Sequence, residues 1–328
     1  MHIETSFYGL IRNDKALPVA KIQPDFVSIA KQAEGASVGN EWINVTERTI
    51  KVGTPRTTNP KGPFCWDNET PERHFGVKPF KAKARGITVG EYAYFMWKSE
   101  VSELPACWVY SSKSSPNGHH VEEPQEYYDI GEGRSVPAEF LAGKWVRTVF
   151  GPQPLAVMLS HPFMGSYHEV SAYASAIGGR IPTREEEESI YAQAEESKAT
   201  DAQNHQAAMI SAVNGSAHPK PWVYALLTHH RHLCNSGVEE SPPLDTCCDG
   251  KHGGFDLCAP GDNYANLKDC NVGMRHFHTT PITHLGNKLC GRCENGGTWM
   301  WTSSVFEAYP GFTGSTTYPG YSGKLTLL

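Results

Sequence analysis

The side chains most able to bind a metal are concentrated in the last third of the sequence, where cysteine and histidine are frequent. Cys290 and Cys293 form a Cys-x-x-Cys pair. Structural zinc usually takes two short-spaced pairs of thiolate or imidazole donors, and one such pair is plain here. A zinc site is therefore one interpretation of this segment, and long loops without a metal are the other. The further candidate donors are Cys247, Cys248, Cys258, Cys270, His252, His276, His278 and His284.

Two tryptophans could bind a cation. Trp299 and Trp301 alternate in a Gly-Gly-Thr-Trp-Met-Trp run. In a strand they would share one face, where two indoles can wall a pocket for a trimethylammonium group. The alternative is that both rings are core aromatics that pack the fold.

An acidic group precedes Pro71. Asp67, Asn68 and Glu69 could supply a pair of carboxylates for acid and base catalysis. Their position before a proline turn instead favours hydrogen bonds that fix a loop. We therefore expect a structural role.

The composition limits both the fold and the partners. The 328 residues are 39% hydrophobic, which supports a buried core, and the 31 Gly and 23 Pro favour a loop-rich α+β fold. With 29 basic and 35 acidic residues and no long basic cluster, nucleic acid is not an expected partner. Prolines at 152, 154 and 162 interrupt the uncharged run 149–167, so no membrane span is expected there. Charges near the amino terminus and nine unpatterned cysteines indicate a cytoplasmic protein with reduced thiols.

Several elements can be predicted from local patterns. Helical spacing marks residues 1–12 and 25–34, and β-like runs begin at Glu41, which places a domain boundary near residue 40. Ser or Thr followed three residues later by Glu predicts a helix start. This pairing occurs at Thr88 and Glu91, at Ser166 and Glu169, and at Thr183 and Glu186, and Gly178-Gly179 should close the second of these helices.

Motifs spread over nearly the whole chain resemble, in order, those of the sulfatase-modifying-factor domain, also called formylglycine-generating-enzyme-like, of fungal hercynine oxygenases. The most specific is Phe64-Cys65-Trp66-Asp67-Asn68-Glu69-Thr70-Pro71-Glu72-Arg73, similar to the Trp-Asp-Asn-Glu-x-Pro signature that opens this domain. Residues 221–231 have no clear counterpart. The later matching segments are 77–80, 85–92, 178–183, 212–215, 235–243, 270–273, 281–283, 286–291 and 296–303.

The resemblance implies a C-type-lectin-like α+β fold over residues 41–328, incomplete at its carboxy terminus. Residues 1–40 would be a remnant of an iron-binding helical bundle and a linker. In the family three histidines hold the iron, two of them in a His-x-x-x-His-x-Glu run, and Met1-His2-Ile3-Glu4 matches the end of that run. His2 is thus the predicted metal ligand of this chain, and alone it should bind iron weakly.

The resemblance also implies the chemistry of a sulfoxide synthase of ergothioneine biosynthesis. Such enzymes use a non-haem Fe(II) and dioxygen to join the sulfur of cysteine to the imidazole of hercynine. Tyr309 is the tyrosine nearest the place where bacterial relatives carry a catalytic phenol. With two iron ligands unmatched, we expect this chain alone to be impaired. The alternatives are a non-catalytic lectin-like binding or scaffold protein and a formylglycine-generating-type oxidase.

Overall fold

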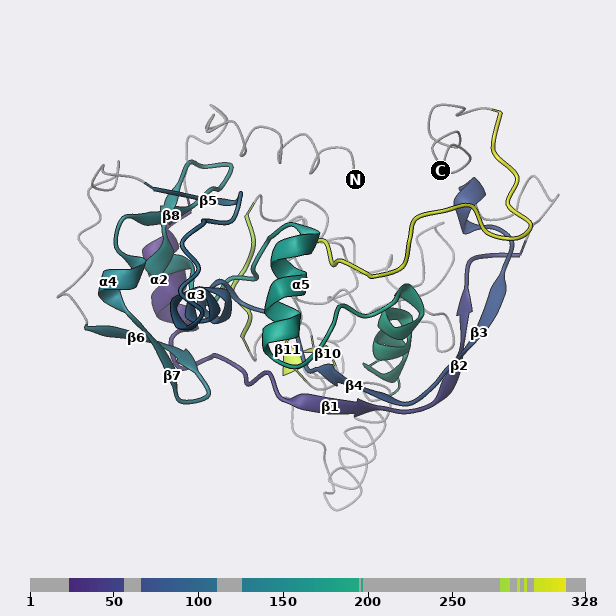
Figure 1. Cartoon of the computed structure of the whole chain (residues 1–328), viewed down its shortest axis with the longest axis horizontal. Helices are drawn as coiled ribbons and strands as arrows, with labels where there is room; N and C mark the ends of the chain where they lie inside the picture. The colour runs from purple at the N-terminus through teal and green to yellow at the C-terminus, as the bar shows by residue number, and fades with distance from the viewer. Residues whose placement is uncertain are drawn as a thin grey trace, which may run out of the picture. The chain divides into compact units, whose positions relative to one another are not determined.

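A computed structural model describes residues 24–55, 66–110, 126–194, 196, 278–283, 288–289, 292–293 and 298–316 (Figure 1). The chain divides into two compact units, each built from segments that are distant in sequence. Unit 1 comprises Met1–Trp42, Lys83–Arg180 and Ala194–Met300, and unit 2 comprises Ile43–Ala82, Ile181–Gln193 and Trp301–Leu328.

The described part of the chain is a mixed α+β structure of short elements, as the composition predicted. Its strands form small sheets with the pairings β1-β4, β2-β3, β5-β8-β9, β6-β7 and β10-β11. The specific C-type-lectin-like arrangement and the boundary near residue 40 stay predictions. The elements are α2 (Phe26–Ala33), β1 (Trp42–Val45), β2 (Arg48–Val52), η1 (Asp67–Glu69), β3 (Arg73–Val77), β4 (Phe80–Lys83), α3 (Val89–Lys98), β5 (Trp108–Tyr110), β6 (Tyr127–Gly131), β7 (Arg134–Pro137), α4 (Ala138–Leu141), β8 (Lys144–Val146), β9 (Gln153–Pro154), η2 (Leu155–Met158), α5 (Tyr167–Ala176), a helix over 184–194, β10 (Lys288–Leu289) and β11 (Arg292–Cys293).

The predicted helix starts are confirmed. At α3, the Glu91 amide donates to Thr88 Oγ1 and the Thr88 amide donates to Glu91 Oε2. Ser166 and Glu169 form the same reciprocal pair of bonds at the start of α5. Thr183 and Glu186 form it at the start of the helix over 184–194. Each pair satisfies two amides that the helix itself leaves without acceptors.

The end of α5 is also as predicted. Gly178 has φ +77°, a left-handed conformation that costs glycine little. The amide of Gly179 donates to Ala174 O and that of Gly178 to Ser175 O, which is the Schellman pattern. The Gly-Gly pair therefore stops the helix at a defined residue.

The core of unit 1 is aromatic and is built around α3. Tyr92 stacks on Phe163 with ring centroids 3.7 Å apart and an interplanar angle of 8°. Trp108 meets both rings edge-on, at 6.0 Å from each centroid. Phe26 of α2 is buried in the same cluster. In the described part of the chain, no helix combines the length and apolar character needed to cross a bilayer.

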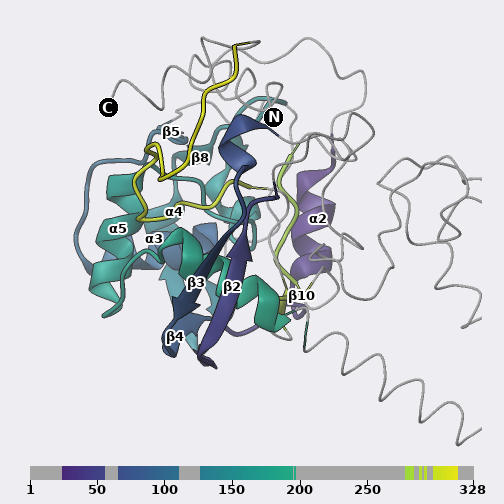
Figure 2. The ribbon, with the colours of Figure 1, turned by 90° about the vertical axis from the view of Figure 1, so that its right-hand side faces the viewer.

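The β2-β3 ladder organises unit 2, and Figure 2 shows its two strands side by side. The pairing is antiparallel, with Ile50 opposite Phe75 and Val52 opposite Arg73. Ile50, Val52 and Val77 are buried, and Phe75 and Phe80 pack against them. The β-like pattern predicted from Trp42 to Val52 is confirmed as β1 and β2.

Candidate functional site

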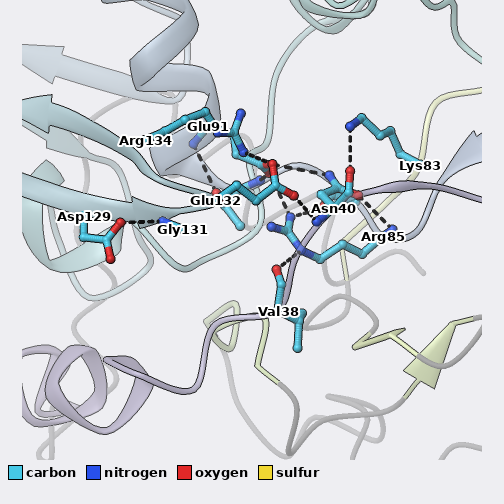
Figure 3. Close-up of polar contacts among 11 residues, drawn as sticks. Val38, Asn40, Lys83, Arg85, Glu91, Asp129, Gly131, Glu132 and Arg134 are labelled. Carbon is cyan, nitrogen blue, oxygen red and sulfur yellow. Dashed lines mark hydrogen bonds and ion pairs between the residues drawn. The ribbon is translucent and has the colours of Figure 1, made fainter.

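A buried carboxylate at the start of α3 holds together segments from across unit 1 (Figure 3). Glu91 Oε2 accepts from Arg85 Nη1 at 2.8 Å and from the Thr88 amide at 2.9 Å. Its Oε1 accepts from Arg134 Nη2 at 3.1 Å and from Asn40 Nδ2 at 3.4 Å. All the oxygen atoms of this side chain are therefore engaged.

The charge state of Glu91 follows from these contacts. Burial by itself raises the pKa of a carboxyl group. In Glu91 the charge and hydrogen bond of Arg85, the Thr88 amide and the charge of Arg134 outweigh burial, so the pKa lies below its ordinary value. An ionised, fully bonded carboxylate has no free oxygen for proton transfer, so Glu91 holds the fold rather than acting as a catalyst.

The β6-β7 hairpin adds a second carboxylate to this network. Glu132 and Gly133 form its two-residue loop, with φ +55° and +68°, as in type I′ turns. Residues other than glycine are uncommon in this conformation. Glu132 Oε1 accepts from the Asn40 amide and its Oε2 accepts from Arg134 Nη2 at 2.8 Å, which fixes the loop.

In unit 2 the signature residues form a turn, here called the signature turn, over residues 66–71. Glu69 Oε2 accepts from the Trp66 amide at 2.7 Å. Asp67 Oδ2 accepts from the Ser315 amide at 2.8 Å. The acidic side chains thus bind backbone amides, and the prediction that they fix a loop is confirmed.

Tyr309 lies against the signature turn. Its hydroxyl donates to the backbone carbonyls of Thr70 and of Asp67, the latter at 3.2 Å. The guanidinium carbon of Arg73 lies 3.7 Å from the centroid of its ring. These contacts fasten the segment around Tyr309 to the turn. The catalytic role that the resemblance implied for Tyr309 stays a prediction.

Trp299 and Trp301 lie neither on a strand nor in the core. Residues 298–302 form no strand, and the two side chains are 58% and 51% exposed. The prediction that they are core aromatics is therefore wrong, as is their placement in a strand. The amide of Ser303 donates to Pro182 O, and this bond fixes the local chain without burying the indoles. Their role in substrate binding stays a prediction.

The described residues do not supply an iron site. No group of three or more His, Cys, Asp or Glu side chains among them is arranged to hold a metal ion. His2 and the predicted helix over 1–12 lie outside the described residues, as do residues 221–231. Among the zinc candidates only the side chain of His278 is described.

Two buried histidines lie near each other in unit 1. His161 is fully buried, and its Nδ1 lies 2.9 Å from Thr279 Oγ1. His278 Nδ1 donates to Thr279 O at 2.7 Å. Burial, with a smaller contribution from His278, lowers the pKa of His161 to about 3, and burial lowers that of His278 as well. Both imidazoles are neutral near pH 7.

The sequence is similar to two fungal proteins of the same name. The Neurospora crassa protein named "Ergothioneine biosynthesis protein 1" is 34% identical over an alignment of 342 residues, which covers 98% of this chain. The Schizosaccharomyces pombe protein of the same name is 29% identical over 212 residues, or 58% of this chain. The chain is homologous to these fungal proteins.

The homology concerns only part of each relative. The alignments cover 36% of the Neurospora protein and 24% of the Schizosaccharomyces protein, so the chain spans about a third of the length of these relatives or less. No family model matches the sequence. The predicted resemblance to a fungal protein of ergothioneine biosynthesis is thus confirmed.

Proposed function

We propose that the chain acts in ergothioneine biosynthesis as the substrate-binding module of a sulfoxide synthase, an Fe(II)- and O2-dependent enzyme that joins cysteine sulfur to hercynine. The observation that carries the proposal is the homology to the Neurospora protein over 98% of the chain. The choice of module rests on the order of the sequence motifs that resemble the sulfatase-modifying-factor-like domain. Cysteine, hercynine and dioxygen are the proposed small-molecule partners.

Iron is the proposed cofactor of the reaction, but the described residues do not fit it. Their donor atoms are engaged elsewhere or isolated, as the saturated Glu91 and the separate hydrogen bonds of His161 and His278 illustrate. We propose that the described part of the chain binds and orients substrates and that His2 contributes to the metal site.

The test combines binding and turnover. Purified chain is titrated with hercynine and with cysteine by calorimetry, and its iron content is measured after incubation with Fe(II). The same protein is then supplied with both substrates and oxygen, and sulfoxide is sought by mass spectrometry. We expect hercynine to bind whether or not iron is present. Failure of hercynine to bind at millimolar concentration would contradict the proposal.

Turnover distinguishes a sulfoxide synthase module from a non-catalytic binding protein. Hercynine binding with stoichiometric iron and sulfoxide formation would extend the proposal to complete catalysis by this chain. Hercynine binding with neither result, even when the remainder of the Neurospora relative is added as a separate fragment, would favour a non-catalytic binding protein.

A further inference from the structure

A cation lies on the apolar face of the β2-β3 ladder. Side chains alternate between the faces of a strand, so Arg73 shares its face with Phe75 and Val77. Val52, which is buried, is the cross-strand partner of Arg73. Arg73 thus lies at the end of the small hydrophobic cluster of unit 2, where a charged group is not needed for packing.

Lys51 and His74 lie on the opposite face of this ladder, whereas Arg48, the cross-strand partner of Val77, lies at the far end of the same face as Arg73. Lys51 is the cross-strand partner of His74. Glu72 forms an ion pair with Lys51, with Oε2 3.6 Å from Lys51 Nζ, and its Oε1 lies within hydrogen-bond distance of His74 Nε2 at 2.9 Å. The carboxylate adjacent to Arg73 in sequence is therefore occupied by these two groups.

The guanidinium of Arg73 is held in place by aromatic rings, and among the described residues it has no acceptor. It lies 3.7 Å above the ring centroid of Tyr309 and 5.6 Å from that of Phe75. Among the described residues it forms no ion pair, and its buried Nε has no hydrogen-bond partner. Tyr309 is itself fixed by its hydrogen bonds to the signature turn.

Stacking does not use the N–H donors of this group, and no described residue accepts from them. A guanidinium binds an aromatic ring through its flat face, whereas its N–H bonds lie in its plane and point outward. A half-buried guanidinium with a fixed plane and free donors suits a planar oxyanion, which it can bind through two parallel hydrogen bonds.

We propose that Arg73 binds the carboxylate of an amino-acid ligand at the signature turn. A singly charged anion is favoured because Asp67, Glu69 and Glu72 lie in or beside the turn and would repel a phosphate dianion more strongly. The assignment deepens the proposed function, on which it rests for the identity of the ligand, because hercynine and cysteine both carry a carboxylate.

The experiment measures binding by calorimetry to the whole chain and to three variants. Arg73→Gln removes the charge and Arg73→Lys keeps the charge but not the planar fork. Lys51→Gln removes a charge from the opposite face of the same ladder and is the matched control. The probes are propionate, methylphosphonate, hercynine and cysteine, together with the decarboxylated analogues of the last two. Circular dichroism checks that each variant is folded.

We expect propionate to bind the unmodified chain more tightly than methylphosphonate. Arg73→Gln should weaken carboxylate binding about tenfold or more, Arg73→Lys should weaken it less, and Lys51→Gln should leave it nearly unchanged. Each substrate is compared with its own decarboxylated analogue. The substrate that loses affinity when its carboxylate is removed is the one that Arg73 binds.

The outcomes separate this site from the proposed function. If hercynine or cysteine binds equally to the chain and to both Arg73 variants, the carboxylate site is refuted and the proposed function is untouched. If propionate binding depends on Arg73 while neither substrate binds, the site stands and the proposed function fails. If no carboxylate binds the unmodified chain, the site is refuted as well.

Discussion

Arg85 and Glu91 form a buried ion pair in which Arg85 Nη1 lies 2.8 Å from Glu91 Oε2 and the side chains are 4% and 1% exposed. A pair of this kind is costly to break, because removing one partner leaves the other charge buried without compensation. Much of unit 1 depends on it, since its contacts reach from Asn40 to Arg134.

We predict that Glu91→Gln destabilises the protein by about 3–5 kcal/mol, because Arg85 and Arg134 lose their common counter-ion. Urea unfolding followed by tryptophan fluorescence, to which the buried Trp108 contributes, measures the change. The control is Glu139→Gln, which makes the same substitution at an exposed side chain and should change the free energy of unfolding little. Equal midpoints for the two variants would show that the pair contributes no net stability.

His161 should make the stability depend on pH. The folded protein binds a proton at His161 only near pH 3, whereas an unfolded histidine binds it near pH 6.5. The unfolded state therefore holds more protons between these values, so stability is complete above about pH 6.5 and falls as the pH drops toward 3. The slope is about 1.4 kcal/mol per pH unit for one such group.

The variant His161→Gln tests the assignment of this slope. It should flatten the dependence of the unfolding free energy on pH between 6.5 and 3, although the loss caused by protonation of Glu91 at low pH remains. Thermal unfolding at a series of pH values measures the effect. A slope that is unchanged in the variant would assign the acid sensitivity to other groups.

Gly90→Ala should destabilise the protein although Gly-to-Ala changes inside helices usually stabilise it by about 1 kcal/mol. A Cβ atom at Gly90 would lie 2.8 Å from Ile130 Cγ2 and 3.0 Å from Leu159 O. The Leu159 oxygen cannot move away easily because it accepts from the Gly90 amide. We expect a loss of about 1–3 kcal/mol by chemical denaturation.

The control for this change is Gly86→Ala, where the added Cβ would meet nothing within 4 Å. The two variants differ in crowding but not in the atoms added. A Gly90 variant as stable as the Gly86 variant would mean that the loop at Leu159 yields to the extra methyl group.

Tyr309→Phe should remove the hydrogen bonds to Asp67 O and Thr70 O but keep the ring beneath Arg73. Each lost bond costs about 0.5–1.5 kcal/mol, so we expect unit 2 to be less stable while carboxylate binding persists. Tyr110→Phe is the control, because that hydroxyl is at the surface and 3.5 Å from its acceptor. Loss of sulfoxide formation without loss of stability would instead support a catalytic Tyr309.

Features determined by neighbouring residues were predictable from the sequence. The capping boxes and the Gly-Gly stop involve residues three to five apart, and all form as expected. The partners of Glu91 could not be predicted in this way, because Asn40 and Arg134 are 51 and 43 residues away in sequence. A glutamate in the first turn satisfies a helix start equally well whether or not arginines surround it.

The tryptophan prediction failed for a related reason. Alternation of Trp299 and Trp301 indicates a shared face only if the segment is a strand, and pairing with another strand depends on distant residues. The role of Tyr309 could not be decided from its position in a motif, because its hydrogen-bond acceptors are backbone atoms more than 200 residues earlier, which no side-chain pattern identifies.

The network around Glu91 also limits where the protein can be truncated. A recombinant fragment that ends between α3 and β7 would retain Glu91 but lack the guanidinium of Arg134. A fragment that starts after Asn40 would lack the side-chain amide of Asn40. Shortened versions for crystallisation or labelling should therefore keep residues 40–134 in one piece, or supply the missing portion as a complementing peptide.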